Sequence, residues 1–327
     1  MQIRVLRGAE IRALLPMAAC IDLMQTTMIA VSQGRAGVPL RSILPLPGGK
    51  GVMGNMPGWL GEPECFGVKL VSIFPGNVAA GYSSHLGLVL LFEAEHGRPV
   101  AILDAAELTA IRTAAVSGLA TRLLGREDAT DLAILGAGEQ ARSHLEAMLA
   151  VRPTRRVRLW ARTAEHAHTF ARSEGERHGI AIEVAPDVRA AVKGADIICT
   201  VTASPEPILP GAWIEPGQHV NLVGSSTVRT AEVDTEAVVK SRFFVDFRES
   251  TVNEGGEYRR ALDAGAIRPD HILAEIGEVA ARAKPGRVHA DDITLFKSLG
   301  ISAEDLASAH YVLEQARVRG VGQVVEL

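Results

Sequence analysis

Between residues 132 and 246 the hydrophobic pattern alternates between two kinds of segment. Short, almost continuous apolar runs are separated by longer segments whose apolar positions recur at the spacing of an amphipathic helix. This alternation predicts a doubly wound parallel sheet, with a right-handed crossover helix between successive strands. The predicted strands are 132–135, 156–160, 180–184, 195–201, 219–223 and 242–246. The predicted helices are 140–150, 164–177 and 187–193, and 230–240 is either a helix or a turn.

The segments before and after this region follow other patterns. Apolar residues at helical spacing predict helices over 8–33 and 104–124. Between these helices, short strand-like runs separated by Gly and Pro predict an antiparallel or mixed sheet. After the alternating region, helices are predicted over 255–264, 271–282 and 303–319.

The change of pattern after residue 124 predicts a domain boundary. With 327 residues, the chain is long enough for two domains. We expect an α/β protein with a Rossmann domain over residues 125–300. A second, α+β domain spans residues 1–124 and is completed by residues 301–327.

The first predicted strand of the Rossmann domain ends in the turn Gly136-Ala137-Gly138-Glu139-Gln140-Ala141. In such a motif the first glycine permits a tight turn, the second lets the backbone approach a pyrophosphate, and the alanine lets the helix pack on the strand. The helix then directs unpaired N–H groups at the phosphates. Because the motif follows a strand and opens a helix, we prefer dinucleotide binding to an ordinary turn of an α/β sheet. The expected cofactor contacts come from Gly136, Ala137, Gly138, Glu139 and Gln140.

The end of the next predicted strand bears on the choice of cofactor. An NAD-binding Rossmann domain commonly carries an acidic residue there, which holds the ribose 2′-hydroxyl. This chain has Arg162 and Thr163 instead, which can bind a 2′-phosphate by charge-assisted hydrogen bonds. We therefore favour NADP(H), with NAD(H) as the alternative. The competing interpretation is that Arg162 is a solvated residue at the start of a helix.

Composition narrows the classes of protein. Hydrophobic residues make up 47% and charged residues 22% of the chain, which is typical of a globular protein, and the net charge of −4 offers no basic surface for nucleic acid. Three scattered cysteines lack the spacing of a metal site, so we expect no metal and a reducing compartment. We find neither a secretion signal nor a run of membrane-spanning length, and we expect a cytoplasmic protein without membrane contact.

Three basic residues lie in stretches that are otherwise apolar. Lys69 lies within the run 66–73, where it is either on the exposed face of a strand or deliberately buried. Arg112 lies on a helical stretch of small residues with little other charge, where a guanidinium needs an anion, such as the carboxylate of an amino or keto acid. Arg41 is a third candidate for the same role.

Four segments resemble the ornithine cyclodeaminase/μ-crystallin family. They are 66–77, which contains Lys69, 84–92, 108–115, which contains Arg112, and 292–300. The resemblance covers nearly the whole chain in order. It implies a homodimer whose first domain forms both the dimer interface and the substrate pocket, next to a Rossmann domain.

The resemblance also implies roles for individual residues. Arg41, Lys69 and Arg112 would face the carboxylate and the reacting nitrogen of the substrate. Thr113 would touch a cofactor phosphate, and the segment Val223 to Ser226 would lie near the nicotinamide. The expected cofactor contacts on this side are Thr202, Val223 and Ser225.

Ser226 distinguishes this chain within the family. Cyclodeaminases and the related alanine dehydrogenase carry an aspartate at this place, which holds an amine of the substrate, whereas the μ-crystallin type carries a serine. A serine cannot anchor an ammonium ion by charge, but it can hydrogen-bond an imine nitrogen or relay a proton. We therefore list Ser226 with Lys69 and Arg112 as candidate catalytic residues.

The function that follows is an NAD(P)H-dependent reductase of α-imino acids, such as pyrroline-2-carboxylate or piperideine-2-carboxylate, producing L-amino acids. Three alternatives stay open at this stage: an ammonia lyase of the ornithine cyclodeaminase type, another amino-acid dehydrogenase or dehydratase on the same scaffold, and a protein that binds NADPH and a small ligand without turnover. The sequence leaves open the ring size of the substrate and the roles of Asp292 and Lys297.

Overall fold

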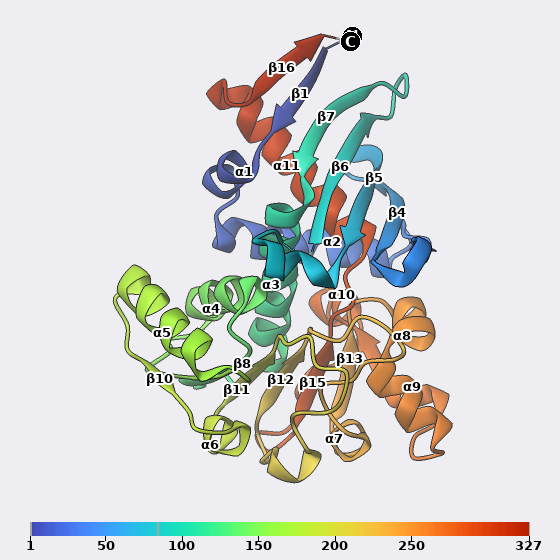
Figure 1. The fold of residues 1–327 in the computed structure, drawn as a ribbon. Helices are drawn as coiled ribbons and strands as arrows, with labels where there is room; N and C mark the ends of the chain where they lie inside the picture. Colours follow the sequence, from blue (N-terminus) through green and yellow to red (C-terminus); the bar gives the residue numbers. More distant parts are fainter. Residues whose placement is uncertain (1, 84, 327) are drawn as a thin grey trace. The chain divides into compact units, whose positions relative to one another are not determined.

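The computed structural model describes residues 2–83 and 85–326 (Figure 1). The chain divides into two compact units: residues 1–113 with 300–327, which we call the mixed-sheet unit, and residues 114–299, which we call the Rossmann unit. The division falls inside helix α3 (Ala105–Leu124), after Thr113, whereas the sequence pattern placed a boundary at the end of this helix.

Eight parallel strands form one sheet within the described part of the Rossmann unit, in the order β10-β9-β8-β11-β12-β15-β13-β14. The predicted doubly wound sheet is thereby confirmed. The strands are β8 (Asp131–Leu135), β9 (Arg156–Trp160), β10 (Ile182–Val184), β11 (Ile197–Thr200), β12 (His219–Leu222), β13 (Arg242–Val245), β14 (Ile272–Glu275) and β15 (Thr294–Lys297). The helices are α4 (Glu139–Val151), α5 (Ala164–His178), α6 (Val188–Val192), α7 (Thr235–Lys240), α8 (Arg248–Glu254), α9 (Gly256–Asp263) and α10 (Ile276–Ala280), with short 3-10 turns η3 (Gly211–Trp213) and η4 (Pro269–His271).

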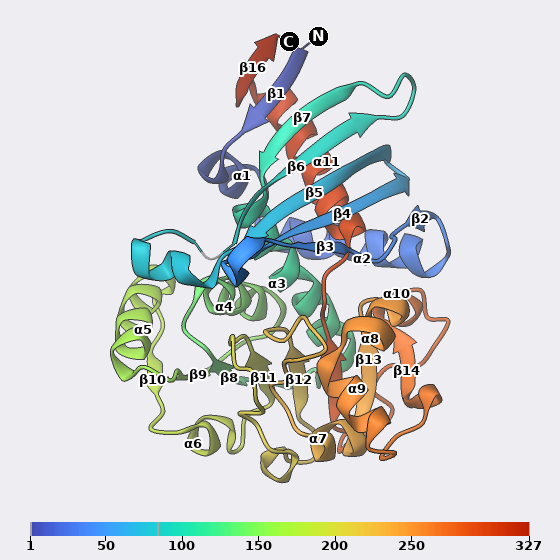
Figure 2. The same ribbon diagram turned by 45° about the vertical axis from the view of Figure 1, so that its right-hand side comes forward.

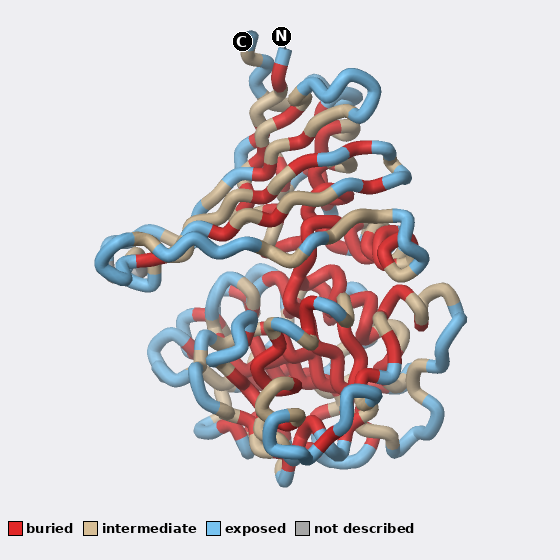
Figure 3. The backbone as a smooth tube through the Cα atoms, turned by 90° about the vertical axis from the view of Figure 1, so that its right-hand side faces the viewer, coloured by how far each residue is buried: buried red, intermediate tan, exposed pale blue. Residues whose placement is uncertain are grey.

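The core of the Rossmann unit lies in its central strands. Every residue of β11 and β12 is buried, as a parallel sheet covered on both faces requires. Figure 3 shows buried stretches, in red, through the interior of this unit. Two polar side chains in β12 each have a hydrogen-bond partner inside this core: the amide of Asn221 donates to Thr121 Oγ1 at 2.9 Å, and His219 Nδ1 lies 2.9 Å from Thr294 Oγ1. The apolar runs that predicted these strands are therefore the same residues that fill the core.

The prediction of a helix over 271–282 is wrong. Residues Ile272 to Glu275 form the edge strand β14, which pairs with β13, and only the short helix α10 follows it. Ile272 and Ala274 are buried while Leu273 between them is 40% exposed, which is the alternation of a strand. A short apolar run is compatible with either structure, and here the backbone hydrogen bonds to β13 decide for the strand.

The mixed-sheet unit contains a sheet in the order β16-β1-β7-β6-β5-β4-β2, with β3 also paired to β4. The paired strands of this sheet are antiparallel, except that β1 and β7 pair in parallel, so the predicted antiparallel or mixed sheet is confirmed. The strands are β1 (Gln2–Leu6), β2 (Ala36–Gly37), β3 (Ser42–Pro45), β4 (Val52–Gly61), β5 (Glu64–Ile73), β6 (His85–Glu93), β7 (Pro99–Asp104) and β16 (Gln323–Glu326), with 3-10 turns η1 (Pro47–Gly49) and η2 (Pro75–Ala80). Ser84, which begins one of the family motifs, lies outside the described residues.

Helix α11 (Ser302–Arg319) lies along one face of this sheet, against β4, β5 and β6 (Figure 2). Gly58 and Gly67 permit this close approach: a Cβ at Gly58 would lie 2.4 Å from Ser302 Oγ, and one at Gly67 would lie 2.8 Å from a methyl group of Leu306. We call the face under α11 the inner face of the mixed sheet and the opposite one its outer face.

The helical region predicted over 8–33 consists of two helices, α1 (Gly8–Leu14) and α2 (Met17–Ser32). Pro16 separates them and forms the N-cap of α2, because proline has no N–H to continue the first helix. No single helix in the described part of the chain is long and apolar enough to cross a membrane, and α1 and α2 meet the criteria of length and composition only as a pair bent by 82°.

Candidate active site

Lys69 is buried on the inner face of the mixed sheet. Inward and outward side chains alternate along β5, and the inward set of Cys65, Gly67 and Lys69 faces α11. The Lys69 ammonium is 2.8 Å from Asp305 Oδ2 and donates a longer hydrogen bond, of 3.5 Å, to Thr109 Oγ1 on α3. With only 4% of its surface exposed, Lys69 does not belong to a solvated face.

Arg112 shares the same carboxylate. Its Nε donates to Asp305 Oδ1 at 2.9 Å, its Nη1 contacts Glu304 Oε2, and 3% of its surface is exposed. Glu304 and Asp305 lie in the first turn of α11, where the helix dipole stabilises negative charge. The two buried cations and two buried carboxylates form a cluster that we call the Lys–Arg cluster.

These two carboxylates correct one part of the sequence analysis. We expected the anion beside Arg112 to be a substrate, whereas the structure supplies Glu304 and Asp305 from the chain itself. The acidic pair escaped notice because carboxylates in the first turn of a helix are common. A substrate carboxylate must therefore use guanidinium donors that these two contacts leave.

Burial determines the acidity of Lys69. Desolvation lowers the pKa of Lys69 to about 8, Arg112 adds to this effect, and Asp305 and Glu304 oppose it. Desolvation also acts against the charge of Arg112, but Asp305 and Glu304 outweigh it and raise the pKa of that group. The cluster thus combines one permanent cation with one ammonium that can release its proton near neutral pH.

Arg41 immediately precedes β3 and is half-buried. Ser42 pairs with Asn55 across β3 and β4, so an extension of this register by one residue brings Arg41 opposite Met56, which itself pairs with Lys69. Two strand spacings, about 10 Å, therefore separate the backbones of Arg41 and Lys69. This distance is within reach of two long side chains that approach one small molecule.

The glycine turn of the Rossmann unit has the geometry that a phosphate ligand requires. Gly136 has φ of +125°, and a Cβ there would lie 2.8 Å from the carbonyl oxygen of Val201, so glycine is needed at this position. Gly138 forms the N-cap of α4 without a side-chain cap, and a Cβ there would meet nothing within 4 Å. The first N–H groups of α4 follow this uncapped glycine, and a helix start of this kind is suited to binding a phosphate. Thr113, the other predicted phosphate contact, is buried on α3.

Arg162 and Thr163 lie between the carboxyl end of β9 and the start of α5. Both are exposed, and Thr163 is the N-cap of α5 but makes no side-chain cap bond. Among the described residues, no carboxylate pairs with Arg162. Both side chains are accordingly available to a ligand at this edge of the sheet.

The predicted nicotinamide contacts lie in the segments that follow β11 and β12, and the structure gives two of them internal partners. The hydroxyl of Thr202 donates to Glu232 Oε1 at 2.7 Å, and the hydroxyl of Ser225 donates to the Thr230 carbonyl at 2.6 Å. Val223 is buried, whereas Ser226 is exposed. Ser226 is thus the residue of this segment whose side chain faces outward, and Glu232 is a residue that sequence reasoning missed.

Two residues without a role in the sequence analysis acquire one. Asp292 Oδ2 accepts the backbone N–H groups of Val288 and His289 at 2.8 and 3.0 Å, so it closes a turn. Lys297 is fully buried at the end of β15, where it pairs with Glu257 at 3.0 Å and donates to the carbonyl of Ser225.

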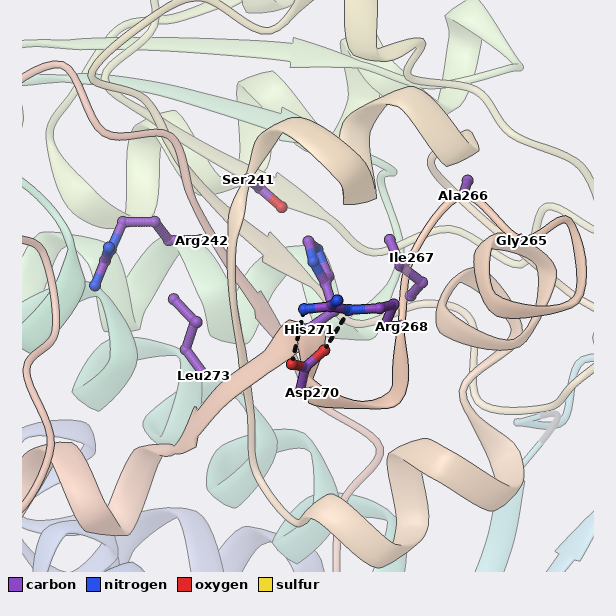
Figure 4. Close-up of a pocket in the computed structure, with 9 residues that line it drawn as sticks. All are labelled: Ser241, Arg242, Gly265, Ala266, Ile267, Arg268, Asp270, His271 and Leu273. Carbon is purple, nitrogen blue, oxygen red and sulfur yellow. Dashed lines mark hydrogen bonds and ion pairs between the residues drawn. The ribbon is translucent and has the colours of Figure 1, made fainter.

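A pocket in the Rossmann unit lies elsewhere in the fold. It is lined by Ser241, Arg242, Gly265, Ala266, Ile267, Arg268, Asp270, His271 and Leu273 (Figure 4). Arg268 pairs with Asp270 at 3.2 Å, and His271 Nε2 lies 2.8 Å from the carbonyl of Val238. Ser241 and His271 directly precede β13 and β14, so the pocket lies at the amino ends of these strands. Ligands of open α/β sheets bind at the carboxyl ends, so this pocket is not the cofactor site.

A parallel Rossmann sheet with an open glycine turn, joined to a second unit with a buried Lys–Arg cluster, defines a class of protein: the nicotinamide-dependent oxidoreductases. Within that class, the chain belongs to the ornithine cyclodeaminase/mu-crystallin family, whose model matches residues 1–320. The resemblance found in the sequence is thereby confirmed.

Relatives in this family support the assignment in sequence and in structure. The ketimine reductase mu-crystallin of Mus musculus is 40% identical over 277 residues, which cover 84% of each chain. The structure of Thermococcus litoralis Δ1-pyrroline-2-carboxylate reductase in complex with NADH and L-proline superposes with a TM-score of 0.96 at 35% identity, over 98% of this chain and 99% of that one. An archaeal alanine dehydrogenase dimer with bound NAD has a TM-score of 0.94 at 30% identity, over the full length of both chains.

Proposed function

We propose that this protein is an NAD(P)H-dependent reductase of cyclic α-imino acids, such as Δ1-pyrroline-2-carboxylate and Δ1-piperideine-2-carboxylate, and that it produces the corresponding L-amino acids. The observation that carries the proposal is the buried Lys–Arg cluster, which combines a carboxylate-binding cation with an ammonium whose pKa is about 8. The names of the mouse and Thermococcus relatives support the same reaction.

The chain's own residues divide the work of substrate binding and protonation. A guanidinium has five N–H donors. Asp305 accepts from Nε of Arg112 and Glu304 accepts from Nη1, so the remaining N–H donors can orient a substrate carboxylate. Arg41 assists from its position just before β3. Lys69 donates a proton to the imine nitrogen, and Ser226 hydrogen-bonds that nitrogen or relays the proton.

The residues of the Rossmann unit fit a nicotinamide cofactor. Gly136 to Gln140 would hold the pyrophosphate, and Thr202, Val223 and Ser225 would contact the nicotinamide end through their backbone or apolar atoms. Thr113, the last residue of the mixed-sheet unit on α3, would touch a phosphate. When bound, the reduced cofactor supplies a hydride to the imine carbon. The C=N bond then becomes CH–NH, with hydride on carbon and the Lys69 proton on nitrogen.

Purified protein tests this proposal directly. We expect substrate-dependent loss of nicotinamide absorbance with the two cyclic imino acids, and an L-amino acid as product. Ammonia release from ornithine or lysine without net cofactor consumption would instead establish the lyase alternative. Reductive amination of pyruvate with ammonia would establish an alanine dehydrogenase. Stoichiometric ligand binding without turnover on any of these substrates would contradict an enzymatic role.

We further propose that the protein prefers NADPH. Its solved relatives hold NADH and NAD, so the preference depends on Arg162 and Thr163 at the end of β9. The substitution Arg162→Gln removes the cation while keeping the length of the side chain, and we expect KM for NADPH to rise about tenfold or more, the usual effect of losing a charge-assisted hydrogen bond. KM for NADH should change less than about twofold. Equal changes in KM for NADPH and NADH would show that Arg162 does not bind the 2′-phosphate.

We also propose a homodimer formed through the outer face of the mixed sheet. This face carries exposed apolar side chains on four neighbouring strands, and one of them, Phe66, stacks on the partly buried Phe92 with 5.2 Å between the ring centroids. A continuous apolar face of this kind is typical of a protein–protein interface. The archaeal alanine dehydrogenase is a dimer, which supports a second copy as the occupant. The exposed apolar residues on this face are Leu44, Met53, Trp59, Phe66, Leu86 and Leu88.

A charge on this face should separate the protomers. We expect Leu88→Asp to convert a dimer into a monomer in sedimentation velocity, because the carboxylate would be buried without a partner in the interface. Val318→Asp is the matched control, since Val318 is an exposed valine near the end of α11, away from the outer face. A Leu88→Asp protein that stays dimeric would place the interface elsewhere.

A further inference from the structure

A buried carboxylate joins two segments at the carboxyl edge of the Rossmann sheet. Glu232 is fully buried and accepts four hydrogen bonds. Its Oε1 accepts the backbone N–H and the hydroxyl of Thr202 at 2.6 and 2.7 Å, and its Oε2 accepts the Thr200 hydroxyl at 2.8 Å and the Gly224 N–H at 2.7 Å. One side chain thereby connects the end of β11 with the segment after β12.

Two further buried charges hold this arrangement from the other side. Glu257, at the start of α9, accepts the backbone N–H of Glu232 at 2.9 Å through Oε1, and its Oε2 lies 3.0 Å from the Lys297 ammonium. Lys297 in turn donates to the carbonyl of Ser225. Four strands and helices far apart in the sequence are thus linked through three charged side chains, none of which the proposed chemistry uses.

The position of these segments in the sheet indicates what they face. The strand order reverses between β8 and β11, and ligands of doubly wound sheets bind across such a reversal. The glycine turn after β8 would take the pyrophosphate, and Arg162 after β9 lies on the side of the adenosine ribose. The other half of a dinucleotide therefore extends over β11 and β12, where Glu232 connects the backbone at Thr202 and Gly224.

We propose that Glu232, supported by Glu257 and Lys297, is a positioning residue that holds the backbone of residues 223–226 against the nicotinamide half of the cofactor. The inference rests on the proposed function, because it requires a dinucleotide at the glycine turn. Glu232 itself does not touch the reacting atoms. It acts through Thr202, Gly224 and the exposed Ser226 that follows them.

The substitution Glu232→Gln isolates this role. A carboxylate only accepts hydrogen bonds, whereas an amide must direct its NH₂ group at one of the two edges, and each edge is occupied by a backbone N–H. Donor would then face donor, and one of the two segments must move. The side-chain volume is nearly unchanged, so the perturbation is confined to this hydrogen bonding.

Calorimetric titration of the full-length variant with NADPH and with 2′-phospho-ADP-ribose, which lacks the nicotinamide, tests the proposal. We expect Glu232→Gln to raise Kd for NADPH about tenfold or more, while Kd for the fragment changes less than about twofold. NADH and ADP-ribose serve as the second pair. Equal weakening of whole cofactor and fragment would show a general structural role and overturn the inference, as would no change in either.

Two further variants keep the result unambiguous. Thr200→Val removes one of the four hydrogen bonds with little change of shape, and it should raise Kd for NADPH about threefold without affecting the fragment, which decides the matter if Glu232→Gln does not fold. Asp196→Asn is the matched control, because Asp196 accepts the N–H groups of Thr130 and Asp131 at the amino edge of the sheet and should alter neither Kd. If the wild type bound neither dinucleotide, the proposed function would fail together with this inference. Normal binding by the wild type with no selective effect in the variants would refute the inference alone.

Discussion

Replacing Lys69 with methionine is expected to lower kcat/KM for Δ1-pyrroline-2-carboxylate by about 10²- to 10⁴-fold, the usual contribution of a positioned general acid. The reason is that Lys69 is a buried ammonium at the cluster, and its pKa of about 8 is matched to proton donation near neutral pH. Methionine has a similar length and fills the same apolar space without a proton. Steady-state kinetics with NADPH measure the effect.

The pH dependence provides an independent check of the same role. Imine reduction requires the protonated form of Lys69, so kcat/KM of the wild type should be constant below the pKa and fall about tenfold per pH unit above pH about 8. The Lys69→Met variant should lack this alkaline limb. Lys69→Arg is the matched control, since it keeps the charge beside Asp305 but cannot release a proton, and it should bind substrate while losing turnover. A Lys69→Arg variant with normal kcat would refute the role of Lys69 as general acid.

The second large effect concerns stability. Asp305→Ala removes the carboxylate that Lys69 and Arg112 share, and two buried cations then lose their common partner. We expect the free energy of unfolding to fall by about 3–5 kcal/mol, as is usual when one member of a buried ion pair is removed. Urea unfolding should show a lower midpoint at an unchanged m value.

An exposed ion pair of the same helix supplies the comparison. Glu314 pairs with Arg317 at 2.7 Å, and both side chains are about half exposed. Glu314→Ala should therefore change the free energy of unfolding by less than about 0.5 kcal/mol. If Asp305→Ala were equally mild, the Lys–Arg cluster would not depend on its carboxylates, and the charge balance derived from the structure would be wrong.

Local patterns sufficed for the parts of the fold whose cause is local. The strand β8, the turn at Gly136 and the helix α4 follow from a short apolar run, a backbone angle that only glycine adopts easily, and helical spacing within a few neighbouring residues. The kind of sheet in each unit was equally accessible, because hydrophobic periodicity is a property of consecutive residues.

Strands that depend on distant partners were not accessible in this way. The sequence analysis did not assign β1, β15 or β16, and it placed a helix over β14. β1 and β16 come from opposite ends of the chain and satisfy one another's backbone hydrogen bonds, and β14 is a strand because β13 lies beside it. The sequence of a four- or five-residue run does not indicate which distant strand it will pair with.

By itself, the sequence of this protein determined the two kinds of sheet, the dinucleotide turn, the family, and the importance of Lys69 and Arg112, since a charge in an apolar run is costly unless it is satisfied. Only the tertiary structure decided which groups satisfy it. Asp305 is 193 residues from Arg112 along the chain. The contacts of Lys297 with Glu257 and Ser225 likewise join residues that are distant in the sequence and that only folding brings together. A charged residue within an apolar run can be recognised in the sequence. The opposite charge that offsets its burial can come from any part of the chain, so only the folded structure identifies it.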